Sequence, residues 1–266
     1  VRVYGRVGLI QGGQPPAARR AGEAPLLPRP AHWGRFVLAA SAIVGFALLL
    51  MELVWYRMLT PLLGGTTFTF GLILAAALLG IGLGSAAYSF WSGGKTPSTG
   101  AFAITCTLEA LAIIVPFAAG DRVAIIANLL RSLGHIGFAG DIMGWSFITL
   151  FVVFPAAFIS GIQFPSLIAL LGRGQEDVGR DVGPAYAWNT GGAQPGALPG
   201  GFGLRPLLTP PGAGPRVAAL LAVSAGLVAI SALRDRQVAS VSVAAVIPIL
   251  AFIGVGAGGT TPVWRH

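Results

Sequence analysis

The stretch FVLAASAIVGFALLLMELVWYRML, residues 36–59, decides the fold class of this chain. A membrane-spanning helix needs about 20 consecutive, largely apolar residues, and this stretch is long enough. Glu52 and Arg57 are its only charged residues, and both lie near its end. The stretch therefore predicts a transmembrane α-helix.

Similar apolar stretches continue along the chain. They predict further spans over residues 68–91, 101–119, 142–171, 185–208, 217–233 and 238–255. The stretch 185–208 is the poorest of these, because it is rich in Gly and Pro. In residues 121–140, apolar residues recur with a period near 3.6, which is typical of an amphipathic helix in the membrane interface. We expect an all-α, polytopic transmembrane helix bundle of six to seven spans plus one interfacial amphipathic helix.

Composition agrees with a lipid environment. The 266 residues are 55% hydrophobic and only 10% charged, whereas a soluble domain has about 25% charged residues. Cys106, the only cysteine, lies in an apolar segment, so no disulfide within the chain and no cysteine-based zinc site is expected. The predicted location is a cell membrane, crossed several times.

The domain organisation follows the same pattern. Residues 1–34 are rich in Arg, Pro and Gly and predict a disordered basic tail; residues 35–258 predict the transmembrane domain. Positive charge before a first span favours a cytoplasmic N-terminus, and the tail is expected to contact the lipid bilayer rather than nucleic acid. Residues 259–266 read as the start of a linker to a soluble domain absent from this chain.

Four polar residues at predicted membrane depth are candidates for function, because ionisable groups there are costly. Glu52 and Arg57 lie beside Trp55 and Tyr56, a pattern that fits an interfacial belt, a structural intramembrane pair, or a ligand or proton site. Glu109 lies in the middle of the third predicted span. A helix-packing hydrogen bond, a pairing with Arg57 and a substrate or proton role all remain open. Asn189 is predicted to hydrogen-bond across helices.

Two glycine motifs stand out. Gly80 and Gly84 form a small-xxx-small face that favours close helix packing; the glycines follow no strand, which argues against a nucleotide loop. Gly161 and Pro165 predict a break in the fourth span, and a broken helix can present backbone groups to a ligand. No catalytic motif or metal-ligand spacing is present, so no catalytic residue, metal or cofactor is predicted in this chain.

These motifs, in this order, resemble the membrane region of spermidine-synthase-like proteins. The resemblance is carried by Glu52-x-x-Trp55-x-Arg57, residues 79–85, Glu109, Gly161-x-x-Phe164-Pro165 and residues 183–193, and it covers about residues 36–210. The apolar helix of that family is replaced here by the Gly- and Pro-rich residues 194–201.

The resemblance implies a function that this chain does not carry by itself. It implies a soluble, Rossmann-type aminopropyltransferase domain as a partner, which transfers an aminopropyl group from decarboxylated S-adenosylmethionine to putrescine. The chain would then anchor or regulate that domain, and whether it belongs to an enzyme stays open. The alternative is a small transporter or half-transporter for a cationic substrate such as a polyamine, with Glu109 and Arg57 lining its path. A purely structural membrane scaffold is a third interpretation.

Overall fold

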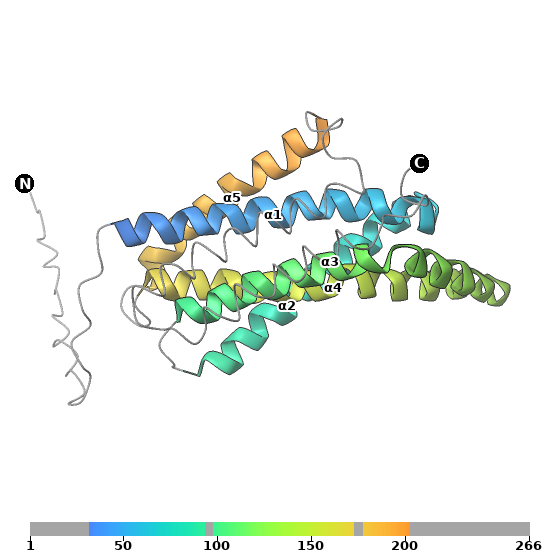
Figure 1. The fold of residues 1–266 in the computed structure, drawn as a ribbon, viewed down its shortest axis with the longest axis horizontal. Coiled ribbons are helices and arrows are strands. Elements are labelled where there is room, and N and C mark those ends of the chain that lie inside the picture. Colours follow the sequence, from blue (N-terminus) through green and yellow to red (C-terminus); the bar gives the residue numbers. More distant parts are fainter. Residues whose placement is uncertain (1–31, 94–97, 173–177, 203–266) are drawn as a thin grey trace, which may run out of the picture. The chain divides into compact units, whose positions relative to one another are not determined.

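The computed structural model describes residues 32–93, 98–172 and 178–202. These residues form five α-helices and one short 3₁₀ helix (Figure 1): α1 His32–Leu63, α2 Thr67–Ser92, α3 Thr99–Leu130, η1 Arg131–Ile136, α4 Phe138–Leu171 and α5 Val178–Phe202. No strand occurs in these ranges, so the described part of the chain is all-α. The predicted disordered tail reaches residue 34, but α1 already begins at His32, because the apolar helix extends a turn before the apolar stretch itself. Residues 1–31 of that tail, the predicted spans 217–233 and 238–255 and the linker 259–266 lie outside the described ranges.

Four helices are long and apolar enough to cross a membrane. They are Trp33–Leu63, Thr67–Ser92, Thr99–Pro116 and Phe138–Leu171, and they coincide with the first four predicted spans. The apolar composition of these helices indicates a membrane protein. Among the described residues, α5 is not counted with these four helices when length and apolar composition are judged together.

The predicted amphipathic helix over residues 121–140 is not a separate element. Instead, α3 continues through Leu130, η1 follows, and α4 begins at Phe138. The 3.6-residue period is correct for the helical part, but periodicity alone does not show whether a helix starts anew or extends the preceding one. The structure shows one long helix followed by a tight connection.

The predicted break at Gly161 and Pro165 is also not observed, because α4 runs without interruption from Phe138 to Leu171. A proline lacks the N–H that would bond the carbonyl four residues earlier, which here is Gly161. The Ser85 hydroxyl of α2 donates to that Gly161 oxygen at 2.9 Å. A neighbouring helix therefore satisfies the acceptor that Pro165 leaves free, as membrane helices commonly require.

The helix ends are grouped at two ends of the bundle. At one end, the indole Nε1 of Trp33 in α1 donates to the Leu170 oxygen of α4 at 3.4 Å. At the other, the Arg131 guanidinium after α3 donates to the Leu62 oxygen of α1 at 3.4 Å, and the Phe68 and Phe138 rings meet with centroids 5.3 Å apart. Successive helices α1 to α4 therefore run in alternating directions.

The α2–α4 contact is built on glycine. A Cβ atom at Gly84 would collide with the Phe158 oxygen, and one at Gly80 would lie 2.8 Å from the Ala157 side chain. A Cβ atom at Gly161 would collide with the Ile81 oxygen. Only glycine allows the two backbones to approach this closely.

The helix α5 lies along α1 (Figure 1). The Asn189 side chain donates to the Ser41 oxygen at 3.0 Å. A Cβ atom at Gly192 would collide with the Ala42 oxygen, and one at Gly196 would lie 2.7 Å from the Phe46 oxygen. Because residue numbers rise together along both helices, α5 runs parallel to α1 beside its membrane-spanning part.

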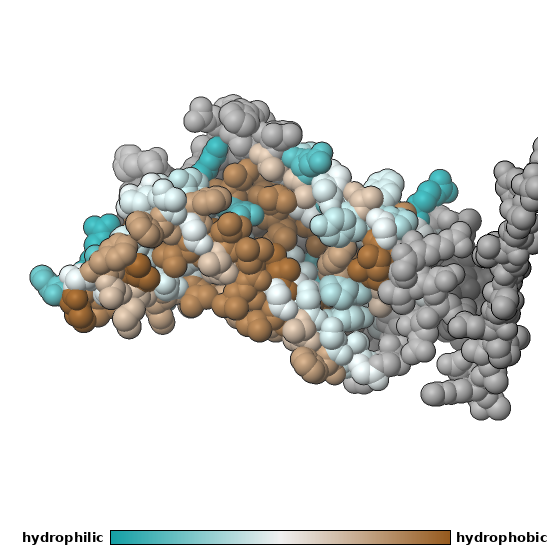
Figure 2. Space-filling model, turned by 180° about the vertical axis from the view of Figure 1, so that it is seen from behind, coloured by the Kyte–Doolittle hydropathy of each residue, from teal (hydrophilic) through white to brown (hydrophobic). Residues whose placement is uncertain are grey.

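The protein surface carries an apolar region that suits lipid. Figure 2 shows brown, apolar residues gathered in the middle of one face, with most teal, hydrophilic residues toward its rim. Large apolar side chains are exposed along α2 and the start of α4, among them Leu78, Leu83, Phe90, Trp91 and Met143. The interior holds a main apolar cluster around Met51, Trp55 and Leu59 of α1, packed against α2, α3 and α4.

Candidate functional site

The buried polar contact between α3 and α4 is the candidate site. The amide Nε2 of Gln163 donates to the Glu109 carboxylate Oε2 at 2.6 Å. Both side chains are buried, with Glu109 2% exposed and Gln163 fully covered. A hydrogen bond between two buried polar groups is electrostatically stronger than one in water.

Helical geometry explains why these groups meet. Ser160 and Gln163 are three residues apart on α4, so they share a face of that helix. The Ser160 side chain contributes a second hydrogen bond to the Glu109 carboxyl group, and Cys106 is buried one turn before Glu109 on α3. The carboxyl group is thus held between two polar side chains of α4 inside an otherwise apolar contact.

One acceptor in this site has no partner. The Gln163 Oε1 atom is buried and receives no hydrogen bond from the described residues. Buried polar atoms are nearly always paired, so this acceptor is an exception among the described residues. Two oxygen acceptors, one from Gln163 and one carboxylate, suit an ammonium group or a water molecule.

The other predicted polar residues lie elsewhere. Glu52 and Arg57 are half-buried on α1. The partners that the structure shows for Glu109 come from α4, not from the α1 arginine that the sequence suggested. Asn189 makes the α5–α1 hydrogen bond described above. The structure therefore joins Glu109 to α4 and Asn189 to α1 as two separate polar contacts.

The glycine candidates lie at helix contacts rather than at a ligand site. Gly80 and Gly84 of α2 face α4, and Gly161 faces the backbone of α2. Pro165 lies one turn beyond Gly161 within continuous α4. Within the described ranges, no group of three or more His, Cys, Asp or Glu side chains could hold a metal ion.

Sequence reasoning did not single out Gln163, Ser160 or Ser85. A signal for the first two exists: a lone amide and a hydroxyl three residues apart within an apolar span mark a polar face. Their partner could not be found that way, because α3 and α4 meet only in the folded bundle.

Comparison with family models, with curated proteins and with solved structures gives no match. The resemblance to spermidine-synthase-like proteins therefore stays a prediction from the motifs.

Proposed function

We propose that this chain is an integral membrane domain of the spermidine-synthase-like type, which anchors or regulates an aminopropyltransferase-type domain. The observation that carries the proposal is where the motif residues lie. Gly84 and Gly161 meet at the α2–α4 contact, Glu109 bonds α4, and Asn189 bonds α1. Motif residues that are far apart in the sequence therefore make contacts between helices of one bundle. This role in packing supports an anchoring domain.

The topology belongs to the same proposal. The six arginines at or before residue 35 favour a cytoplasmic N-terminus, which puts the Trp33 and Leu170 end of the bundle on the cytoplasmic side. The helix α5 then enters the bilayer from that side as a fifth span. Its parallel course beside Ser41, Ala42 and Phe46 of α1 supports this placement.

The anchoring proposal is tested with protein purified from its native membranes in mild detergent. We expect the preparation to transfer an aminopropyl group from decarboxylated S-adenosylmethionine to putrescine, and to yield a soluble-type domain on mass spectrometry. Alkaline carbonate washing should leave the present chain in the membrane. A pure, carbonate-resistant chain without transferase activity or an accompanying domain would refute the anchoring role.

A second function is favoured by the orphan acceptor at Gln163. The Glu109 carboxyl group and the Gln163 Oε1 atom together offer an amine two oxygen atoms that can accept hydrogen bonds. A polyamine transporter or sensor would use such a pair at membrane depth. In that case Glu109 contacts substrate instead of serving packing alone.

Equilibrium binding separates the two functions. The purified chain is titrated with putrescine, spermidine and decarboxylated S-adenosylmethionine, and Glu109→Gln is compared with Glu52→Gln, a half-buried acid on α1. Binding that is lost only in Glu109→Gln supports the transporter or sensor. Binding that is absent in all proteins, or equal in both variants, eliminates Glu109 as a polyamine site.

A further inference from the structure

The helix α5 carries a polar strip on the face that points away from α1. The strip consists of Thr190, Gly191, Gln194 and Pro195, which are all exposed, and a Cβ atom at Gly191 would meet nothing within 4 Å. Residues one helical turn apart share a face, so the four form one surface. Because a proline has no N–H, Pro195 leaves the Gly191 carbonyl oxygen without its usual donor within the helix.

The polar strip lies beside the membrane-spanning part of α1. Asn189 donates to the Ser41 oxygen, and Gly192 packs against the Ala42 backbone. Ala42 is about 9 Å from Leu48, the middle residue of the span Trp33–Leu63. The hydrocarbon core extends about 15 Å to either side of its centre, so the strip lies within the core. This depth rests on the topology proposed above, in which α1 and α5 span the bilayer.

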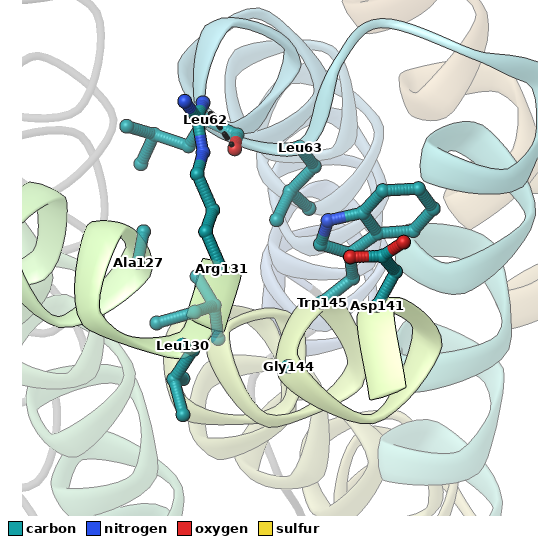
Figure 3. A pocket seen from close by; sticks show the side chains of 9 residues that line it. Leu62, Leu63, Ala127, Leu130, Arg131, Asp141, Gly144 and Trp145 are labelled. Atoms are coloured by element: carbon teal, nitrogen blue, oxygen red, sulfur yellow. Dashed lines mark hydrogen bonds between the residues drawn. The ribbon is translucent and has the colours of Figure 1, made fainter. Parts of the chain in front are cut away.

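Hydrocarbon does not satisfy such polar groups, because it supplies no hydrogen-bond donors. Elsewhere in the bundle, neighbouring elements bond the main-chain oxygens that a helix leaves free. The Ser85 hydroxyl of α2 donates to the Gly161 oxygen that Pro165 leaves free. The Arg131 guanidinium donates to the Leu62 oxygen in the last turn of α1 (Figure 3). We therefore expect another helix with a hydroxyl donor to cover the polar strip.

Pro155 of α4 is also exposed, but its surroundings differ from those of Pro195. Phe147 and Phe151, which share its face of α4, are exposed and apolar. That face suits lipid. The polar strip adds an exposed hydroxyl and an exposed amide to the carbonyl, which lipid does not suit.

We propose that the predicted span 217–233 packs on the polar strip, and that its Ser231 hydroxyl donates to the Gly191 oxygen. This segment follows α5 in the chain after residues 203–216, and consecutive elements are usually neighbours in space. It also contains two hydroxyl donors, Ser224 and Ser231, among apolar and small residues.

The depth of each serine distinguishes between them. In the proposed topology α5 runs away from the cytoplasm, so the segment 217–233 returns toward it. Its middle residue is Ala225, and Ser231 lies about 9 Å beyond the middle on the cytoplasmic side. Ala42 of α1 lies at the same distance on the same side, next to the polar strip. Ser224 lies at the middle and does not match this depth.

Disulfide cross-linking of the full chain in membranes, with Cys106→Ala, tests the contact. Gly191→Cys is paired in turn with Ser231→Cys, with Ser224→Cys and with Ser240→Cys, which lies at a similar depth in the predicted span 238–255. We expect a cross-link within one chain for Ser231→Cys alone. A cross-link with Ser240→Cys instead, or one that doubles the mass of the product, would overturn the proposal and identify the other span or a second copy as the neighbour.

The Gly191→Cys variant alone separates a failure of this proposal from a failure of the topology. Its thiol should resist a membrane-impermeant maleimide added from either side, because α5 spans the bilayer. Rapid labelling would refute the α5 span and the proposal with it. Protection without a cross-link to Ser231→Cys would overturn the contact alone.

A double-variant cycle tests the hydrogen bond itself. Ser231→Ala should lower the midpoint of thermal unfolding in detergent, and it should not do so in a Pro195→Ala background, where an N–H returns to the Gly191 oxygen. Ser224→Ala is the matched control and should have the same small effect in both backgrounds. Equal losses from Ser231→Ala in both backgrounds would overturn the assigned hydrogen bond.

Discussion

The side chains of Glu109 and Gln163 form a buried hydrogen bond that joins α3 to α4. The sequence singles out Glu109, because an acid in the middle of an apolar span is conspicuous. It does not reveal that Gln163 of α4 donates to the Glu109 carboxylate at 2.6 Å. That partner depends on the register in which α3 and α4 pack, and a single sequence does not specify this register.

Replacing Gln163 with Leu should destabilise the protein by about 1–3 kcal/mol, because the buried Glu109 carboxylate then loses a donor. The double variant Glu109→Leu/Gln163→Leu should recover part of that loss, since neither polar group remains unpaired. Unfolding by dodecyl sulfate, followed by circular dichroism in mixed micelles, measures both values.

Thr105→Val serves as the control for this pair, because the Thr105 hydroxyl donates to the Phe102 oxygen of its own helix. It should cost less than Gln163→Leu. Equal stability of Gln163→Leu and the parent chain would show that the Glu109–Gln163 bond does not support folding.

Ser85→Ala should destabilise the protein by about 0.6–1 kcal/mol, because the Gly161 oxygen then has no donor. The loss should shrink when Pro165 is also changed to Ala, which restores an N–H within α4. Ser89→Ala is the matched control, since Ser89 bonds its own helix and is exposed. The same denaturation assay applies, and an additive double variant would contradict the account.

At the level of elements, glycine determines which helices approach closely. The small-xxx-small spacing of Gly80 and Gly84 predicted close packing, and the structure places α4 against these residues. The sequence did not predict the close contact of Gly192 with α1, because the Gly- and Pro-rich composition of 185–208 reads as a poor helix. Tertiary packing outweighs intrinsic propensity there.

Gly84→Ala and Gly82→Ala form a matched pair on α2. A Cβ atom at position 84 would meet the Phe158 oxygen, whereas one at position 82 has nothing within 4 Å. We expect Gly84→Ala to cost about 1–3 kcal/mol and Gly82→Ala to be neutral or slightly stabilising, because alanine favours helix. Thermal unfolding in detergent measures the difference. Equal effects would refute the α2–α4 contact.

Neighbouring glycines on α5 provide the same comparison. A Cβ atom at Gly192 would collide with the Ala42 oxygen of α1, while Gly191 has open space around it. Gly192→Ala should therefore loosen α5 from α1 and expose the α5 backbone to limited proteolysis, and Gly191→Ala should not. Identical protease sensitivity of both variants would show that α5 does not pack on α1 as described.

For the whole molecule, length and hydropathy were sufficient to locate four helices long and apolar enough to cross a membrane, because crossing a bilayer imposes a length and an apolar composition. The sequence patterns were wrong about where helices are interrupted. Residues 121–130 extend α3 instead of forming a new helix. The helix α4 continues past Pro165, where the Ser85 hydroxyl donates to the Gly161 oxygen that the proline leaves without an N–H donor. Both outcomes depend on neighbouring helices, which periodicity and proline content do not report.

Cysteine labelling tests the alternating course of the helices. In a Cys106→Ala background, exposed positions Thr66 and His135 should react with a membrane-impermeant maleimide from one side, and Arg35 and Trp91 from the other. The helix ends group in this way in the structure. The cytoplasmic side should be that of Arg35. Labelling of Thr66 and Arg35 from the same side would refute a membrane-crossing α1.

The hydroxyl of Ser85 has a consequence for how the protein is made. Ribosomes deliver α2 to the bilayer before α4, so the donor is in place when the segment containing Pro165 arrives. Until the two helices meet, newly inserted α4 carries an unsatisfied carbonyl at Gly161, which hydrocarbon penalises. We therefore expect the insertion of α4 to be completed when it associates laterally with α2, a helix that is made earlier.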